Sequence, residues 1–144
     1  MTGYFKNPYF SEAELRCKGT GKLLIEPEFL KRLIELRERV GVPFQITSAC
    51  RSPEHNARIG GASGSMHLTE NARFKHVDGR VLNTCAVDIR KTSALMRRKE
   101  LFKWHTANLN LSIGGGRTFY HVDLARELTT EVQRPLFTYK NGSF

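Results

Sequence analysis

Two apolar segments of the sequence each carry one ionisable side chain near their centre. Asp88 lies within the segment 85–89 and His121 within the segment 118–124, and both segments are rich in the β-branched and aromatic residues that favour strands. Burying a carboxylate or an imidazole without a partner is costly in free energy. A fold that contains these strands must therefore provide a metal ion, an ion pair or a core hydrogen bond for each group.

The remaining elements follow from periodicity and from helix-end and turn residues. Apolar residues at helical spacing between Pro27 and Val40 predict the clearest helix, which Gly41 should end. A polar stretch over 69–83 predicts an excursion, either a hairpin or an ordered loop. The other expected elements are a lead-in over 1–25 with a short helix capped by Ser11, a strand over 44–47, a short helix opening at 52–54, a basic helix from Thr92 or Ser93 to about Ala107, and a turn at 114–116.

Length and charge limit the class of protein. The chain has 144 residues, which fits one domain, and its net charge is +9. Such a surface attracts nucleic acid, the anionic bacterial envelope or acidic lipids, although it can also serve solubility alone. No helix-turn-helix, RNP-like strand or C-x-x-C finger is visible, so we expect no specific nucleic acid. We also expect no membrane span and, since no signal peptide is visible, synthesis in the cytoplasm.

The three cysteines contain no C-x-x-C pair and are odd in number, so we expect buried free thiols at Cys17, Cys50 and Cys85.

His67 follows a loop of glycine and serine residues. Together with Asp88 and His121 it completes a possible set of two imidazoles and one carboxylate. Such a set leaves one position of a tetrahedral zinc ion open to water, which is typical of catalytic sites.

Four motifs occur in an order that points to a known family. They are the run from Ile46 to Ala62, which contains Arg51-Ser-Pro-Glu-His-Asn, then Ser65-x-His67, Ala86-x-Asp88 and His121-Val-Asp123. Over roughly residues 10–125 the sequence resembles the zinc D-alanyl-D-alanine carboxypeptidases, including their phage-type peptidoglycan peptidases. The resemblance implies one α+β domain over 1–144, with helices packed on a small antiparallel sheet, as in the fold shared with hedgehog signalling domains. It also implies zinc bound by His67, Asp88 and His121.

The same resemblance suggests roles for three further residues. Arg51 would bind a carboxylate of the substrate, since a guanidinium stays charged and offers a fork of donors. The alternative for Arg51 is an ion pair with a nearby acid. Ser65 would contact substrate or only form a turn. Asp123 would orient an imidazole, act as a base, or only form a hydrogen bond at the strand end. His55 is expected to be structural, and His76 and His105 have no matched role.

The sequence departs from the family pattern at two places. His67 and Asp88 are 21 residues apart instead of seven, and an insertion of about 14 residues in a loop costs little closure entropy. This insertion leaves Asp78 as an alternative ligand, and Thr84 stands where the family has Gly. Thr118 stands where many members place an acidic general base. The base is therefore unassigned, with Glu70, His76, Asp78 and Asp123 as candidates.

These observations predict a zinc-dependent metallopeptidase that cleaves peptidoglycan stem peptides as a carboxypeptidase or an endopeptidase. We expect it to act at the bacterial cell wall, in phage lysis or on a virion, where its positive charge would favour the anionic envelope. Two alternatives stay open. Thr118 and the long spacing favour a non-catalytic zinc-binding assembly module, and only the charge favours a nucleic-acid-binding protein.

Overall fold

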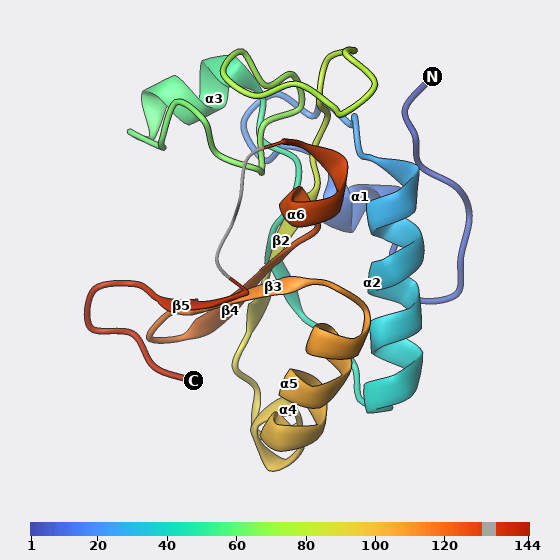
Figure 1. The fold of residues 1–144 in the computed structure, drawn as a ribbon, viewed down its shortest axis with the longest axis vertical. Helices are drawn as coiled ribbons and strands as arrows, with labels where there is room; N and C mark the ends of the chain where they lie inside the picture. Colours follow the sequence, from blue (N-terminus) through green and yellow to red (C-terminus); the bar gives the residue numbers. More distant parts are fainter. Residues whose placement is uncertain (131–134) are drawn as a thin grey trace.

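A five-stranded sheet forms the centre of the computed structural model, which describes residues 1–130 and 135–144. The strands are β1 (Ile46–Ser48), β2 (Ala86–Arg90), β3 (Ser112–Gly115), β4 (Phe119–Asp123) and β5 (Leu136–Thr138), in the order β1-β2-β4-β3-β5 (Figure 1). Neighbouring strands are antiparallel except β3 and β5, which are parallel. The predicted α+β class is confirmed, and the sheet departs from the expected antiparallel pattern only at the β5 edge.

The helices in the described residues are α1 (Glu12–Leu15), α2 (Pro27–Val40), α3 (Pro53–Arg58), α4 (Ser93–Arg97), α5 (Lys99–Asn108) and α6 (Ala125–Leu128). The two longest, α2 and α5, cover one face of the sheet (Figure 1). Helix α5 packs on α2 and on β3, while α3 and the segment 69–83 lie at the opposite end of the molecule (Figure 1). No helix in the described part of the chain is long and apolar enough to cross a membrane.

Along the central strands, buried apolar side chains alternate with polar side chains that point to the other face of the sheet. Val87 and Ile89 of β2 are fully buried in the same hydrophobic cluster as Leu33 of α2. Because successive side chains of a strand point to opposite faces, Asp88 points away from this cluster. His121 lies directly opposite Asp88 on β4, so both groups project from the face that the large helices leave open.

Several predicted element ends are confirmed. Pro27 lies in the first turn of α2, and Gly41 ends that helix in the left-handed conformation, with φ 77°. The Ser11 and Thr92 side chains each accept a hydrogen bond from the first turn of a helix. All three cysteines are buried free thiols.

Two predictions about the second half of the chain are wrong. The expected helix ending near Ala107 is two helices, because the chain leaves helical geometry at Arg98, whose guanidinium donates to the Val40 carbonyl at 2.8 Å. The glycines at 114–116 do not form the expected turn, since Gly114 and Gly115 belong to β3. A Cβ atom on Gly114 would lie 2.5 Å from the ring of Phe137, so only glycine allows this close approach.

The segment 69–83 is an ordered excursion attached to the body at several points. Lys75 and Val81 form an antiparallel bridge, and His76 pairs with Thr129 beyond α6. Arg80 binds the Glu26 carboxylate with both terminal nitrogens, at 2.6 and 3.0 Å. The Glu26 side chain is 2% exposed at the start of α2, so Arg80 supplies a cation to a buried carboxylate.

Removing the guanidinium of Arg80 tests this attachment. We expect Arg80→Gln to lower the free energy of unfolding by about 1–3 kcal/mol, because the Glu26 carboxylate stays buried without its cation. Urea denaturation measures the change. Arg58→Gln, at an exposed arginine on α3, is the matched control and should change stability by less than about 0.5 kcal/mol. Equal effects of the two substitutions would contradict the assignment.

Candidate metal centre

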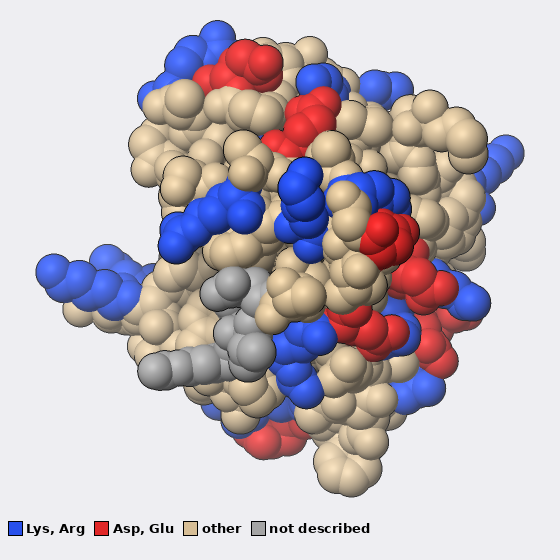
Figure 2. All heavy atoms as spheres, turned by 45° about the horizontal axis from the view of Figure 1, so that its top comes forward, with Lys and Arg blue, Asp and Glu red and all other residues tan. Residues whose placement is uncertain are grey.

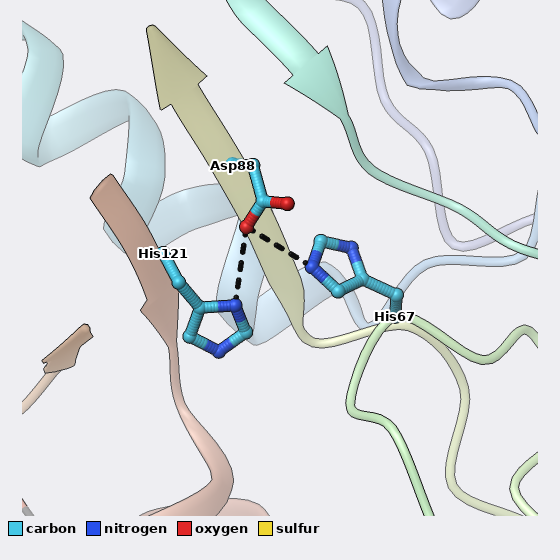
Figure 3. Close-up of side chains that lie close together, drawn as sticks. All are labelled: His67, Asp88 and His121. Atoms are coloured by element: carbon cyan, nitrogen blue, oxygen red, sulfur yellow. Dashed lines mark hydrogen bonds and ion pairs between the residues drawn. The ribbon is translucent and has the colours of Figure 1, made fainter. Parts of the chain in front are cut away.

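His67, Asp88 and His121 converge on one point above the open face of the sheet (Figure 3). The Asp88 Oδ1 atom lies 3.2 Å from His67 Nε2 and 3.2 Å from His121 Nδ1. One ligand atom from each residue lies within 4.8 Å of the others. The structure therefore brings together the three residues that the sequence suggested as metal ligands.

The sheet positions Asp88 and His121, whereas a loop positions His67. The backbone of His67 is held by its carbonyl, which accepts hydrogen bonds from the Arg51 amide and from the Thr84 hydroxyl, both at 2.8 Å. The Cys85 amide donates to the Met66 carbonyl at 3.0 Å. Both ends of the excursion are thus joined beside the site, so the longer spacing between His67 and Asp88 does not separate them.

Hydrogen bonds behind the two imidazoles determine which ring nitrogen faces Asp88. His67 Nδ1 lies 2.8 Å from the Ala49 carbonyl, which can only accept, so this nitrogen carries the proton. His121 Nε2 likewise donates to Asp123 Oδ2 at 2.8 Å, while Asp123 Oδ1 accepts from the Ala125 amide at 3.0 Å. Asp123 is fully buried and holds the ring of His121 in one orientation.

The donor set fits a zinc ion. With its proton on Nδ1, neutral His67 presents a lone pair on Nε2 toward the Asp88 carboxylate, and two acceptors 3.2 Å apart need a cation beside them. His121 Nδ1 faces the same oxygen. Two imidazole nitrogens and one carboxylate oxygen are ligands that zinc prefers, and their second nitrogens have the acceptor contacts typical of zinc-bound histidines.

Burial and charge shift the pKa values of the cluster in different directions. Burial lowers the pKa of His67, which favours the neutral ligand form. Burial also opposes charge on His121, but hydrogen bonds and negative charge from Asp123 and Asp88 outweigh it and raise the pKa of His121 to about 9. The two imidazoles outweigh burial at Asp88 and hold the pKa of its carboxyl below its usual range. Without a metal, His121 therefore carries a proton at neutral pH.

The cluster faces a cleft of about 510 Å³. The Asp88 side chain is 17% exposed, and the two imidazoles are nearly buried. Aromatic and basic side chains surround the cluster. Besides His67, Asp88 and His121, the cleft is lined by Arg51, Ala62, Gly64, Ser65, Met66, Arg73, Phe74, Phe119, Phe137 and Tyr139.

Arg51 lies in this cleft, where neutral side chains hold its guanidinium. Its terminal nitrogens donate to Asn56 Oδ1 at 3.2 Å and to Ser48 Oγ at 3.3 Å. Among the residues that the structure describes, no ion pair within 4.0 Å includes Arg51, so the alternative of a structural ion pair is not realised. Ser65 lines the same cleft, and its hydroxyl accepts from the His67 amide at 3.2 Å.

The other candidate acids lie elsewhere. Asp78 pairs with His76 at 3.1 Å and with Arg80 at 3.2 Å, and Glu70 pairs with Lys22 at 2.7 Å. None of them lines the cleft, and Asp123 lies behind His121. The geometry favours Asp88 over Asp78 as the carboxylate ligand. Among the described residues that line the cleft, Asp88 is the single carboxylate.

Residues near the C-terminus form a wall of the cleft that the sequence did not suggest. The ring centroids of Phe137 and Tyr139 lie 5.9 and 6.2 Å from that of His121. Both rings occupy the space above Gly114, which lies opposite His121 in the sheet. The alternating aromatic and polar residues over 137–140 are the signal that could have predicted strand β5 and this wall.

Two carboxylate substitutions distinguish the ligands. Asp88→Asn should reduce zinc affinity at least about 100-fold, because it removes an anionic oxygen from the cluster. Asp78→Asn is the matched control and should leave zinc binding unchanged. Zinc titration against a competing chelator, with circular dichroism to verify folding, measures both. A loss of zinc in Asp78→Asn alone would transfer the carboxylate role to the excursion.

The pKa of His121 makes zinc binding dependent on pH. Zinc needs the neutral imidazole, so below pH 9 the ion must displace a proton from His121. The apparent zinc affinity should therefore rise about tenfold per pH unit between pH 7 and 8.5. Asp123→Asn removes a negative charge from His121, lowers its pKa and should flatten this dependence. A wild-type affinity that does not change over this range would contradict the assignment.

Comparison with known proteins agrees with this geometry. A search of curated proteins gives no match to the chain. The family model described as Peptidase M15 matches residues 8–123, which include His67, Asp88, His121 and Arg51. Because this match covers most of the sequence, the chain belongs to the peptidase M15 family, whose members are metallopeptidases that typically depend on zinc.

Proposed function

We propose that this chain is a zinc-dependent peptidase that hydrolyses a peptide bond in peptidoglycan stem peptides. The observation that carries the proposal is the His67, Asp88 and His121 cluster at a cleft that also presents Arg51. Three protein ligands leave a position for water or substrate. When bound, zinc lowers the pKa of that water and polarises the carbonyl of the bond to be cleaved.

The chain's own residues prepare this chemistry. Asp123 fixes the orientation of the His121 ring, and the Ala49 carbonyl does the same for His67. Such contacts hold ligands in their binding geometry before the metal arrives. The low pKa of the Asp88 carboxyl keeps it ionised over the whole working range of pH.

Arg51 gives the cleft its preference for an acidic peptide. Its guanidinium is held by the neutral side chains of Asn56 and Ser48, so its charge is available to a ligand. A carboxylate can accept two parallel hydrogen bonds from an arginine. A peptide terminus or side-chain carboxylate bound there would place a neighbouring peptide bond near the metal cluster.

The general base distinguishes a peptidase from a non-catalytic zinc module. Thr118 is exposed and carries no carboxylate, and the described lining of the cleft offers only Asp88. A positioned base contributes about 10²–10⁴-fold to a rate. The non-catalytic module therefore stays the second candidate, and the measurement of hydrolysis decides between the two.

The surface charge supports action on an anionic polymer. Lys and Arg side chains are spread over the face shown in Figure 2 in separate groups, with Asp and Glu side chains between some of them. Such a distribution suits weak attraction to an anionic envelope. Action at the cell wall, in phage lysis or on a virion, stays a prediction.

Hydrolysis tests the proposal. Zinc-loaded protein should release fragments from purified peptidoglycan, and a chelator should stop the release. Arg51→Gln should lower kcat/KM by about 10- to 100-fold while zinc binding is kept, because it removes a charge-assisted contact of about 1.5–3 kcal/mol and not a ligand. Arg58→Gln is the control and should behave as wild type.

Two results would contradict the proposal. Zinc-loaded wild type that leaves peptidoglycan and D-Ala-terminated peptides uncut would favour the non-catalytic module. Full activity of Arg51→Gln would remove the assigned carboxylate contact.

A further inference from the structure

We propose that Arg73 is a second carboxylate-binding residue of the cleft. The preferred ligand is then a peptide that places one carboxylate at Arg51 and a further, internal carboxylate at Arg73. This inference rests on the proposed function and names its substrate class more closely. The residue belongs to the excursion over 69–83, where the sequence departs from the family pattern.

Arg73 is charged, lines the cleft and forms no ion pair with an acidic side chain of the described residues. It lines the same cleft as the metal cluster, and its guanidinium carbon lies 5.1 Å from the ring centroid of Phe74. No ion pair among the described residues includes Arg73. Three other charged side chains of the excursion have partners outside the cleft: Glu70 with Lys22, Asp78 with His76, and Arg80 with Glu26.

Asn71 fixes the backbone of Arg73 to the loop that precedes His67. The side chain of Asn71, which is 6% exposed, accepts from the Arg73 amide at 3.0 Å and from the Phe74 amide at 2.8 Å. Its amide group donates to the Ser65 carbonyl at 3.0 Å. The position of the Arg73 backbone relative to the metal cluster is therefore set by a buried side chain, while the exposed guanidinium lies against the ring of Phe74.

The same loop relates Arg73 to Arg51. A Cβ atom on Gly61 would lie 3.2 Å from Arg51 Nη1, and one on Gly64 would lie 2.9 Å from Arg73 Cδ. Three residues of chain span at most about 10 Å, so the two arginines touch the loop at points no farther apart than this. An extended peptide covers the same length in about three residues, so carboxylates two or three residues apart can reach both arginines.

The positive charge of Arg73 also disfavours peptides that carry a cationic group or an amide at this position. A peptide with a lysine or other cationic group at the Arg73 position would meet a like charge, and a neutral amide would leave the guanidinium without an anion. Discrimination of this kind comes from repulsion as well as attraction. We therefore expect a preference for an internal carboxylate over its amide.

Three synthetic stem-type peptides test the inference. One has both of its internal carboxylates free, and each of the others has one of them amidated; all keep a free C-terminus. Binding to zinc-loaded protein by calorimetry and cleavage by chromatography are measured for wild type, Arg73→Gln, Arg73→Lys and the control Arg58→Gln. Thermal unfolding verifies that each variant is folded.

Wild type and Arg58→Gln should bind the free-acid peptide about 3- to 10-fold more tightly than one of the two amidated peptides. Added salt should reduce this preference. Arg73→Gln should bind the acid and the amide equally, and Arg73→Lys should keep part of the preference, since it keeps the charge but not the fork of donors. Zinc affinity should be the same in all four proteins.

The two measurements separate this inference from the proposed function. Cleavage by wild type without any preference, or a preference that survives in Arg73→Gln, would overturn the role of Arg73 and leave the peptidase standing. A preference in binding that Arg73→Gln removes, with no cleavage of any peptide, would support the inference and overturn hydrolysis. Absence of binding to all three peptides would overturn the role of Arg73.

Discussion

The antiparallel register between β2 and β4 is the constraint on which the site depends. It places Asp88 directly opposite His121 on the face of the sheet that the large helices leave open. Because side chains alternate along a strand, a slip of one residue would turn both groups into the core and turn Val87 and Val122 outward. The fully buried valines therefore fix the register, and the hydrophobic core determines the geometry of the metal cluster.

The cluster itself could be predicted because burial makes its residues conspicuous in the sequence. An aspartate and a histidine at the centres of apolar strands needed partners, and these strands do provide them for each other. Periodicity together with Pro27 and Gly41 at the two ends predicted the helix Pro27–Val40. The orientation of His67 was not accessible in this way, since it depends on the carbonyls and hydroxyls of Ala49 and Thr84, which carry no pattern in the sequence.

The aromatic wall of the cleft was not predicted, because its position also depends on contacts between residues far apart in the sequence. Strand β5 is short and pairs in parallel with β3, so its position depends on tertiary contacts more than on its own sequence. The glycines of β3 resemble a turn until the rings of Phe137 and Tyr139 are seen above Gly114. The excursion could be recognised as an insertion, but the contacts of Asn71 and Arg80 that order it join positions whose relation no local pattern shows.

The two ends of the excursion are joined beside the metal cluster by the Thr84 hydroxyl on the His67 carbonyl and the Cys85 amide on the Met66 carbonyl. Closure at its base lets the length of the excursion change while the ligand geometry is kept, because added residues cost little closure entropy. A scaffold of this kind can acquire new ligand preferences by exchanging one surface loop. The sheet that carries the metal cluster and the excursion beside the cleft can then change independently during evolution.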